Sequence, residues 1–202
     1  MIWNAEKIKK EIEENDLITG FLDLETQLQP NGFDLTVEKI HEFHPNPKNF
    51  ISFENKFIDE REPIRFGKIF LYTKLEKGVY KFKVNETIKI PPNACAISTQ
   101  RSSVMRMGNL CNVGFWDAGY HGSGYSIIVV NNPVRIFKNA RLIQIYFMGL
   151  SDTTKLVYGG NYQWENIICP ELNKPCIGEK CGMVKDGICK INPSIYNEKI
   201  SV

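Results

Sequence analysis

Short strand-like segments separated by turn residues recur along the middle of this chain, and they constrain its fold more than any other feature. Residues 79–84 (VYKFKV) alternate between apolar and polar side chains, as a strand with one buried face does. Glycine, proline and asparagine separate such segments at spacings of about 8–12 residues, which is typical of barrels and jelly rolls. We expect strands at residues 69–74, 79–84, 87–90, 94–100, 124–130, 134–137 and 142–148. The predicted fold class is therefore mainly all-β.

The N-terminus adds one short peripheral helix to this prediction, over residues 3–18. Asn4 is a suitable N-cap, lysine and glutamate fill the polar face, and Gly20 follows as a stop. The apolar residues near one face are Ile8, Ile12 and Leu17. After this helix, residues 27–37 begin with a Pro-Asn-Gly turn and continue as a short β segment. Residues 41–63 have the composition of a loop.

Composition bounds the class of protein. With 202 residues, of which 43% are hydrophobic, we expect one folded domain at residues 1–165 and an appendage at residues 166–202. A net charge of +2 gives no bulk attraction to nucleic acid. The N-terminal stretch is charged from Glu6 onward, and no apolar run approaches the ~18 residues of a membrane span. We therefore expect a cytoplasmic protein with mostly reduced cysteines and no membrane or nucleic-acid partner.

Acidic and basic residues are distributed unevenly in the second half of the chain. Within residues 87–151, Asp117 is the only carboxylate. Six cationic residues share this region: Lys89, Arg101, Arg106, Arg135, Lys138 and Arg141. Ser102 and Ser103 follow Arg101 directly and add neutral donors for phosphate oxygens. The pattern indicates a polyanionic ligand beside one reactive carboxylate; the basic surface of an ordinary β domain has the same composition and is the alternative.

Two further segments carry residues whose roles stay open. Asp34 lies between Phe33 and Leu35 in a segment that alternates like a half-buried strand, so it is either a structural acceptor or a site residue. Residues 158–163 (YGGNYQ) place two glycines between aromatic residues, which fits a flap over phosphates and equally an ordinary loop. The chain contains no G-x-x-x-x-G-K-[ST] motif and no strand-led G-x-G-x-x-G motif, so P-loop and dinucleotide folds are unsupported.

Four of the six cysteines crowd the C-terminal appendage, with the spacing C-x6-C-x4-C-x7-C. They are Cys169, Cys176, Cys181 and Cys189. Four thiolates suit a tetrahedral Zn²⁺ site or an iron–sulfur cluster, and a metal would stabilise a short segment with little apolar content. Disulfides or unligated thiols are the alternatives, because the spacing lacks the paired C-x-x-C of the most diagnostic metal sites.

With these segments placed, the chain resembles the dUTPase / dCTP deaminase family, and within it the archaeal-type dUTP nucleotidohydrolases. Five stretches match the family's motifs in order: residues 29–35 (QPNGFDL), 101–106 (RSSVMR), 114–120 (GFWDAGY), 140–144 (ARLIQ) and 158–163 (YGGNYQ). Each stretch is short, and the specificity comes from their common order. The resemblance implies a distorted jelly-roll or β-barrel subunit in a homotrimer, with active sites between subunits.

The reaction that the resemblance implies is hydrolysis of dUTP to dUMP and pyrophosphate, with Asp117 deprotonating the attacking water. Mg²⁺ would be held largely by the substrate phosphates, and Asp34 would contribute to the metal or to structure. The residues implied in phosphate binding are Arg101, Ser102, Ser103, Arg106 and Gln144, of which Arg106 would brace the site or touch substrate.

The nucleoside is implied to bind at the third motif. Backbone groups along residues 113–120 would read the edge of uracil. Tyr120 would pack under the deoxyribose and exclude a 2′-hydroxyl, or would serve only as a core or interface aromatic. Tyr158 and Gln163 would complete the site from the C-terminal motif, in which Asn161 stands where relatives often carry lysine.

One departure from the family pattern decides between hydrolase and deaminase. The deaminases place a glutamate about ten residues beyond the aspartate as a proton shuttle, because deamination needs a group that takes and gives protons. Here Ile127 lies in that strand, and no acid occurs in residues 118–151. We therefore interpret the chain as a dUTP diphosphatase. The alternatives are a bifunctional dCTP deaminase/dUTPase and a non-catalytic deoxynucleotide-sensing module, and retention of Asp117 disfavours the module.

Overall fold

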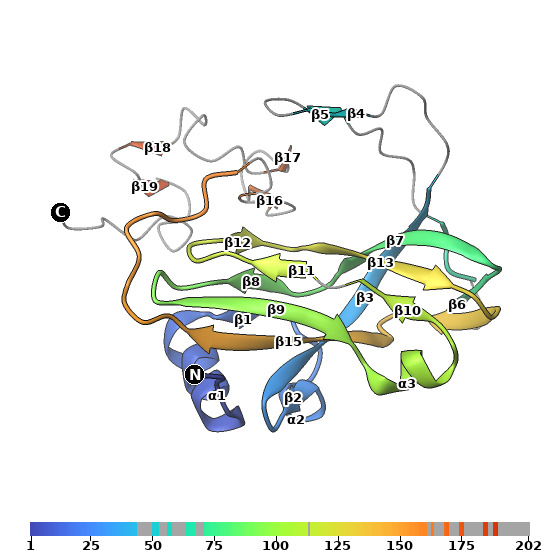
Figure 1. The fold of residues 1–202 in the computed structure, drawn as a ribbon, viewed down its shortest axis with the longest axis horizontal. Helices are drawn as coiled ribbons and strands as arrows, with labels where there is room; N and C mark the ends of the chain where they lie inside the picture. Colours follow the sequence, from blue (N-terminus) through green and yellow to red (C-terminus); the bar gives the residue numbers. More distant parts are fainter. Residues whose placement is uncertain are drawn as a thin grey trace.

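An eight-stranded antiparallel sheet is the largest unit of the described structure (Figure 1). The computed structural model describes residues 1–43, 50–52, 56–57, 64–67, 71–112, 114–160 and 163, with residues 168–169, 174–175, 184–185 and 188–189. The sheet order is β10-β13-β7-β3-β15-β9-β11, and β2 pairs with β3. Its strands are β2 (Leu28–Gln29), β3 (Gly32–Glu42), β7 (Gly78–Val84), β9 (Ala94–Gln100), β10 (Leu110–Cys111), β11 (Gly114–Trp116), β13 (Tyr125–Val130) and β15 (Arg141–Gly149). These strands confirm the mainly β fold expected from the sequence.

The long strand β3 bends the sheet into a half-barrel. Its first half pairs with β15, and its second half, from Val37 onward, pairs with β7. The register shifts between Val37 and Lys39 on one side and between Arg141 and Ile143 on the other. Such irregularities increase local twist and let one strand join two differently oriented parts of a sheet.

Smaller antiparallel pairs complete the secondary structure. β1 (Ile18–Thr19), β8 (Thr87–Lys89) and β12 (His121–Gly122) form a three-stranded sheet in the order β1-β8-β12. The two-stranded pairs are β14 (Val134–Phe137) with β6 (Tyr72–Leu75), β4 (Phe50–Ile51) with β5 (Lys56–Phe57), β16 (Ile168–Cys169) with β17 (Lys174–Pro175), and β18 (Val184–Lys185) with β19 (Ile188–Cys189).

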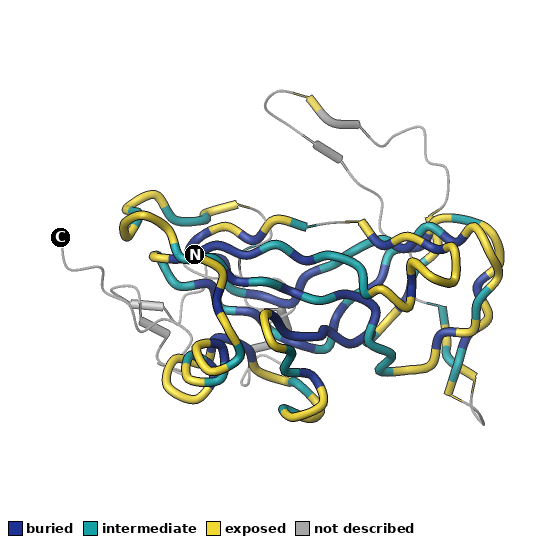
Figure 2. Tube along the Cα trace, turned by 60° about the horizontal axis from the view of Figure 1, so that its bottom comes forward, coloured by how far each residue is buried: buried dark blue, intermediate teal, exposed yellow. Residues whose placement is uncertain are grey.

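The strands build the core, and along them buried residues alternate with more exposed ones (Figure 2). Among its largest fully buried side chains are Phe33, Phe82, Phe147, Leu35, Ile40 and Ile128. Helix α1 (Ala5–Asn15) covers part of this core with Ile8 and Ile12, and the Trp3 ring stacks on Phe147 at 5.6 Å. Burial of this apolar surface is the main stabilising contribution to the fold.

Several boundaries agree with the sequence prediction. The strands expected at residues 94–100 and 134–137 form with those limits, and Asn4 caps α1 by accepting a hydrogen bond from the Lys7 amide. The helix is shorter than expected, because Asp16 adopts a left-handed conformation and ends it before Gly20. The prediction of a loop from residue 41 was also wrong at its start, since β3 continues to Glu42. In the described part of the chain, no helix is long and apolar enough to cross a membrane.

Candidate active site

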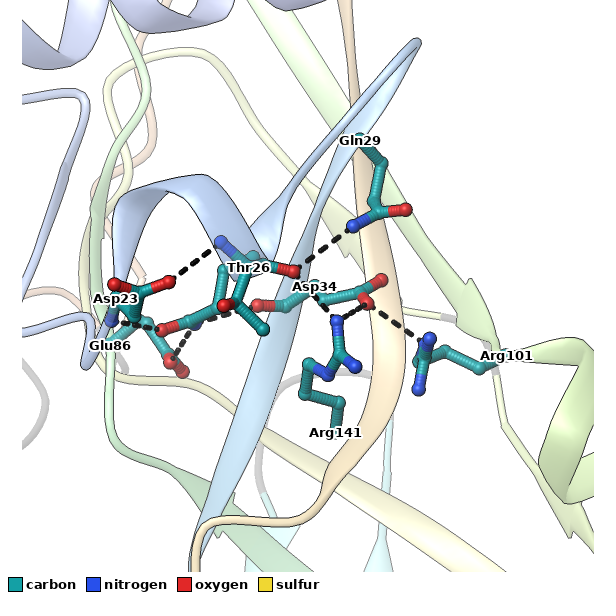
Figure 3. Close-up of polar contacts among 8 residues, drawn as sticks. Asp23, Thr26, Gln29, Asp34, Glu86, Arg101 and Arg141 are labelled. Carbon is teal, nitrogen blue, oxygen red and sulfur yellow. Dashed lines mark hydrogen bonds and ion pairs between the residues drawn. The ribbon is translucent and has the colours of Figure 1, made fainter.

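Asp34 is the centre of a charged cluster beside β3 and β15 (Figure 3). Its side chain is 1% exposed, and its Oδ2 atom accepts from Arg101 Nε at 2.9 Å and from Arg141 Nη1 at 3.2 Å. The second carboxylate oxygen, Oδ1, is buried and has no hydrogen-bond partner among the residues that the structure describes. Burial raises the pKa of Asp34, and the two guanidinium groups oppose that shift. The cluster holds one negative and two positive charges.

The prediction that Asp34 lies in a half-buried strand was wrong, because both faces of β3 are covered there. Phe33 and Leu35 face the core, while helix α2 (Leu24–Gln27) and the two arginines cover the face that carries Asp34. The Arg141 guanidinium also donates to the Thr26 carbonyl at 2.6 Å, which ties α2 to the cluster. The alternation of apolar and polar residues correctly identified the face of β3 that points to the core. It gave no information on the opposite face.

A second buried carboxylate, Glu86, holds β3 in place from the other side. It accepts from the Thr36 amide at 3.0 Å, the Thr36 hydroxyl at 2.6 Å and Gln27 Nε2 at 2.8 Å. The same Gln27 amide donates to the Asp34 carbonyl at 2.8 Å. Burial raises the pKa of Glu86, and these hydrogen bonds oppose it. Buried polar groups are stable only when they are hydrogen-bonded, so this network fixes the backbone at Asp34.

The second motif forms a short helix, α3 (Ser102–Arg106), directly after β9. Val104 anchors the helix in the core, whereas Ser102, Ser103 and Arg106 are exposed. The loop after α3 is fixed by Asn109, whose buried Oδ1 accepts from the amides of Asn131 and Asn132. The exposed donors of α3 therefore project from an anchored helix at the same end of β9 as Arg101.

Gln144 belongs to the same end of the sheet. In β15 it is paired with Asp34 of β3 and with Thr99 of β9. A Cβ atom on Gly32 would lie 2.7 Å from the Ile145 carbonyl oxygen and 3.0 Å from Gln144 Cγ. The glycine of the first motif is therefore needed for close approach of the β2–β3 turn to β15. Together these residues form what we call the arginine cluster: Asp34, Arg101, Ser102, Ser103, Arg106, Arg141 and Gln144.

The third motif forms a tight turn between β11 and β12. Asp117 is exposed at this turn, and its carbonyl accepts from the Tyr120 amide at 3.1 Å. Tyr120 is 7% exposed, and its ring lies between those of Trp116 and Tyr158, at 5.2 and 5.5 Å. The exposed carboxylate is thus carried on a turn that is anchored by buried aromatic rings.

The C-terminal motif packs against this turn. The Tyr158 amide donates to the Ala118 carbonyl at 2.8 Å. The Gln163 carboxamide accepts from the His121 amide at 3.0 Å and donates to the Gly119 carbonyl at 2.8 Å. The thick orange trace after β15 in Figure 1 follows this segment as it returns toward the turn. Together these residues form what we call the hairpin cluster: Asp117, Gly119, Tyr120, His121, Tyr158 and Gln163.

The arginine and hairpin clusters lie at opposite ends of β9. Trp116 is paired with Ala96, so Asp117 follows beside Cys95, while Arg101 comes after the last residue of β9. Six residues of strand separate these points, or about 20 Å along the chain. One copy of the chain therefore does not bring Asp117 together with the arginines and serines of the second motif.

The described side chains form no evident metal site. In the parts of the chain that the structure describes, no group of three or more His, Cys, Asp or Glu residues could hold a metal ion. Asp34 does not fit direct coordination of Mg²⁺, because Oδ2 already binds two guanidinium groups and Oδ1 is buried. The side chains of Cys169, Cys176, Cys181 and Cys189 lie outside the described residues.

Comparison with known proteins identifies the family. The family model described as dCTP deaminase-like matches residues 2–150. The chain is 38% identical over 170 residues to the "Probable deoxyuridine 5'-triphosphate nucleotidohydrolase" of Archaeoglobus fulgidus, covering 82% of this chain and 98% of that protein. It is also 38% identical over 144 residues to the "Deoxyuridine 5'-triphosphate nucleotidohydrolase" of Methanocaldococcus jannaschii, covering 69% and 88%. The chain belongs to the dCTP deaminase-like family.

A solved structure supports the fold. The crystal structure of 2'-deoxycytidine 5'-triphosphate deaminase from Agrobacterium tumefaciens superposes with a TM-score of 0.56 at 21% sequence identity. The alignment covers 72% of this chain and 47% of that chain, so the present protein spans about half the length of that deaminase. The likeness confirms the shared dCTP deaminase-like fold.

Sequence reasoning named most of these positions as candidates and did not name a few residues that support them. Arg141 lies within the fourth motif, so its proximity to the site was detectable, but its pairing with Asp34 was not. Gln27, Glu86 and Asn109 carry no sequence signal, because only the folded chain shows that these polar side chains are buried. In this dCTP deaminase-like chain, Ile127 lies on β13 opposite Lys81 of β7.

Proposed function

We propose that this protein hydrolyses dUTP to dUMP and pyrophosphate. The observation that carries the proposal is Asp117, the only acid in residues 87–151, exposed on an anchored turn. The relatives from Archaeoglobus fulgidus and Methanocaldococcus jannaschii, both named dUTP nucleotidohydrolases, support the same substrate. Ile127 on β13 supports hydrolysis over deamination, because its side chain can neither take nor give a proton.

In the proposed reaction, Asp117 takes a proton from a water molecule as the water oxygen attacks the α-phosphorus. A bond forms between that oxygen and the α-phosphorus, and the bond from this phosphorus to the α,β-bridging oxygen breaks. The electron pair leaves with the bridging oxygen on pyrophosphate. Asp117 is well suited to this role because its side chain is exposed, so a water molecule can reach the carboxylate.

The arginine cluster is proposed to bind the triphosphate. Arg101, Ser102, Ser103, Arg106 and Gln144 supply donors for the phosphate oxygens. Asp34 is proposed as a positioning residue, because it holds Arg101 and Arg141 with one buried oxygen. Mg²⁺ is proposed to arrive with the substrate phosphates and to offset their charge, which needs no dedicated carboxylate cage.

The hairpin cluster is proposed to bind the nucleoside. The Tyr120 ring, fixed between Trp116 and Tyr158, gives a rigid surface on which a deoxyribose can pack. Backbone groups of the turn are proposed to read the base. Tyr158 and Gln163 are proposed to act from the C-terminal segment.

A homotrimer with sites between subunits is the proposed assembly. It is supported by the separation of the two clusters along β9, because a second copy of the chain would have to complete each site. A row of apolar side chains on the outer face of the sheet also supports contact between copies. Phe115, which is 61% exposed, is paired with Ile97, and Ile97 is paired with Tyr146.

The C-terminal residues 166–202 are proposed as a separate appendage that binds Zn²⁺ or an iron–sulfur cluster through its four cysteines. The cysteine spacing supports this proposal. Metal analysis of purified protein by mass spectrometry tests it. About one zinc or several iron atoms per chain is the expected result, and a metal-free protein with four titratable thiols would contradict it.

Product analysis by chromatography tests the proposed reaction. Purified protein is incubated with dUTP, dCTP, dTTP or UTP, first with Mg²⁺ and then with EDTA. The expected result is dUMP from dUTP in the presence of Mg²⁺. A uridine nucleotide formed from dCTP would favour a bifunctional deaminase. Four intact nucleotides, with dUTP still bound, would favour the sensing module.

A further inference from the structure

Arg141 is held at one corner of its guanidinium group. Its Nη1 atom donates to Asp34 Oδ2 at 3.2 Å and to the Thr26 carbonyl at 2.6 Å (Figure 3). Within the described part of the chain, both hydrogen bonds of this guanidinium are made by Nη1. The remaining donors, on Nε and Nη2, form one edge of the planar fork. The Arg141 side chain is 32% exposed, so it can offer that edge to a ligand while the protein holds the opposite corner.

The two contacts of Arg141 fix more than a single contact would. Asp34 Oδ2 also accepts from Arg101 Nε at 2.9 Å, so one carboxylate oxygen serves both guanidinium groups. A single shared oxygen sets the distance of a guanidinium but lets it turn about the contact. The Thr26 carbonyl is the second attachment point of Arg141. The direction of the Arg141 fork therefore depends on where helix α2 holds this carbonyl.

Helix α2 cannot hold that position by its own backbone. It has four residues, and a single helical turn is unstable alone because the cost of nucleation is offset only in longer helices. The last carbonyls of a helix have no partner inside the helix, which leaves the Thr26 carbonyl available to Arg141. Glu25 and Thr26 are themselves exposed. The position of α2 must therefore be set by contacts outside the helix.

Gln27 supplies these contacts. It is the buried residue of α2, with 1% of its surface exposed. Its Oε1 atom accepts from the amides of Leu22 at 2.7 Å and Asp23 at 3.1 Å. Its Nε2 atom donates to the Asp34 carbonyl and to Glu86 Oε1, both at 2.8 Å. One carboxamide thus uses its full set of donors and acceptors to join α2 to the preceding segment, to β3 and to the turn before β8.

The partner of Gln27 at that turn is rigid. Glu86 is fully buried and accepts from both the amide and the hydroxyl of Thr36. Loss of the Gln27 carboxamide would leave the Asp34 carbonyl and one Glu86 oxygen short of a donor, and two amides without an acceptor. Unpaired buried polar groups are costly, so α2 would shift to let water reach them. The Thr26 carbonyl would move with the helix.

We propose that Arg141 binds the phosphates of the substrate with Nε and Nη2, and that Gln27 is the positioning residue that orients it. Two N–H groups on one edge of a guanidinium match two oxygens of a phosphate group. Gln27 acts through α2 and the Thr26 carbonyl, from a buried site behind the cluster. The inference rests on the proposed function, because it assumes a triphosphate at the arginine cluster. It concerns the affinity for the phosphates, whereas the proposed base belongs to the hairpin cluster.

A double-variant comparison tests whether Gln27 acts through Arg141. The probe is a dUTP analogue with NH in place of the α,β-bridging oxygen, titrated by calorimetry in the presence of Mg²⁺. Arg141→Ala is expected to raise the dissociation constant about 30-fold, because charged hydrogen bonds to phosphate are lost. Gln27→Ala is expected to raise it about tenfold, because the guanidinium remains but is misdirected. The double variant is expected to match Arg141→Ala, since no guanidinium is left to orient.

Kinetics and two further variants complete the experiment. In Gln27→Ala the KM for dUTP is expected to rise, while kcat changes less than about twofold. Glu25→Ala is the control on the same helix: its side chain is 81% exposed, and neither the dissociation constant nor KM is expected to change. Gln27→Glu keeps the side-chain size and an acceptor oxygen but loses the amide donors. It replaces Gln27→Ala in the same comparison if circular dichroism shows that the alanine variant is unfolded.

The outcomes separate this inference from the proposed function. If the effects of Gln27→Ala and Arg141→Ala multiply in the double variant, Gln27 stabilises the fold without acting through Arg141, and the inference alone is overturned. An unchanged dissociation constant in Arg141→Ala overturns it as well. If the unmodified protein neither binds the analogue nor hydrolyses dUTP, the proposed function fails, and the role of Arg141 fails with it.

Discussion

The arginine cluster and the hairpin cluster are built in opposite ways. Around Asp34, charged side chains are partly or fully buried and hold one another through short ion pairs. Around Asp117, the contacts are made by backbone groups and aromatic rings, and the single acid is left exposed. A polyanion is bound by fixed cations, and a buried anion is an effective way to fix them. A flat base and a sugar are bound by shape and by backbone edges, which need no charge.

Replacing the aspartate of each cluster with asparagine should affect activity and stability differently, and the largest effect on activity is expected at Asp117. Asp117→Asn removes the proposed base, so kcat for dUTP is expected to fall by about 10³-fold or more. The free energy of unfolding is expected to change by less than about 0.5 kcal/mol, because the side chain is exposed. Rates are measured by pyrophosphate release and stability by urea unfolding. Asp152→Asn, at another exposed acid, is the control and is expected to keep full activity. A D117N variant with normal kcat would remove Asp117 from the mechanism.

Mixing variants of the two clusters tests whether the site forms between copies of the chain. Asp117→Asn and Arg101→Ala chains, each nearly inactive alone, are co-expressed with different tags and the mixed oligomers are purified. If each site takes one cluster from each of two subunits, about one quarter of the sites are intact after random assortment. General-base removal is expected to lower activity by about 10³-fold. With one quarter of the sites intact, the mixed oligomers are therefore expected to be about a hundredfold more active than either variant alone.

The matched control mixes two variants of a single cluster. Arg101→Ala and Arg106→Ala both affect the end of β9 that carries α3, so no mixture restores a complete cluster. Activity is expected to stay at the level of the single variants. Recovery in this control, or none in the first mixture with mixed oligomers confirmed by mass, would contradict sites that are shared between subunits.

The sequence predicted those features of the two clusters that depend on neighbouring residues. It did not predict the features that depend on residues far apart in the chain. The limits of β9 and the Asn4 cap follow from neighbouring residues, so alternation and capping rules found them. Asp117 was singled out as a candidate because it is the only acid in residues 87–151, a long basic region. The buried roles of Glu86 and Gln27 were not predictable, because their partners are far away in sequence. The distance between the clusters depends on the pairing of β9 with β11, which no single segment encodes.

A smaller effect is expected for Asp34→Asn. Without the carboxylate, Arg101 and Arg141 repel each other beside a buried amide, and the free energy of unfolding is expected to fall by about 2 kcal/mol. The KM for dUTP is expected to rise more than kcat falls, because the arginines are less well fixed. Urea unfolding and steady-state kinetics measure both effects. Normal stability with loss of Mg²⁺ dependence would instead make Asp34 a metal ligand.

The smallest expected effect is a difference in acid stability between the clusters. Burial, with Lys89 acting in the same direction and Asp16 opposing, lowers the pKa of His121 to about 4. The unfolded chain therefore binds a proton at His121 before the folded protein does, so stability is lost as the pH falls from about 6.5 toward 4. At pH 5.5 the loss is expected to be about 1 kcal/mol.

Two buried carboxylates, Asp34 in the arginine cluster and Glu86 beside it, act with the opposite sign. Burial raises the pKa of Asp34 and of Glu86, so the folded protein binds those protons more tightly, and stability rises as the pH falls through their folded pKa values. His121→Gln should therefore flatten the loss of stability near pH 5.5 and leave the gain from the two buried carboxylates intact. Glu86→Gln should remove part of that gain and leave the loss caused by His121 unchanged. Urea midpoints measured from pH 8 to pH 4 separate the two, and identical profiles for the unmodified protein and the H121Q variant would show that His121 does not couple folding to protonation.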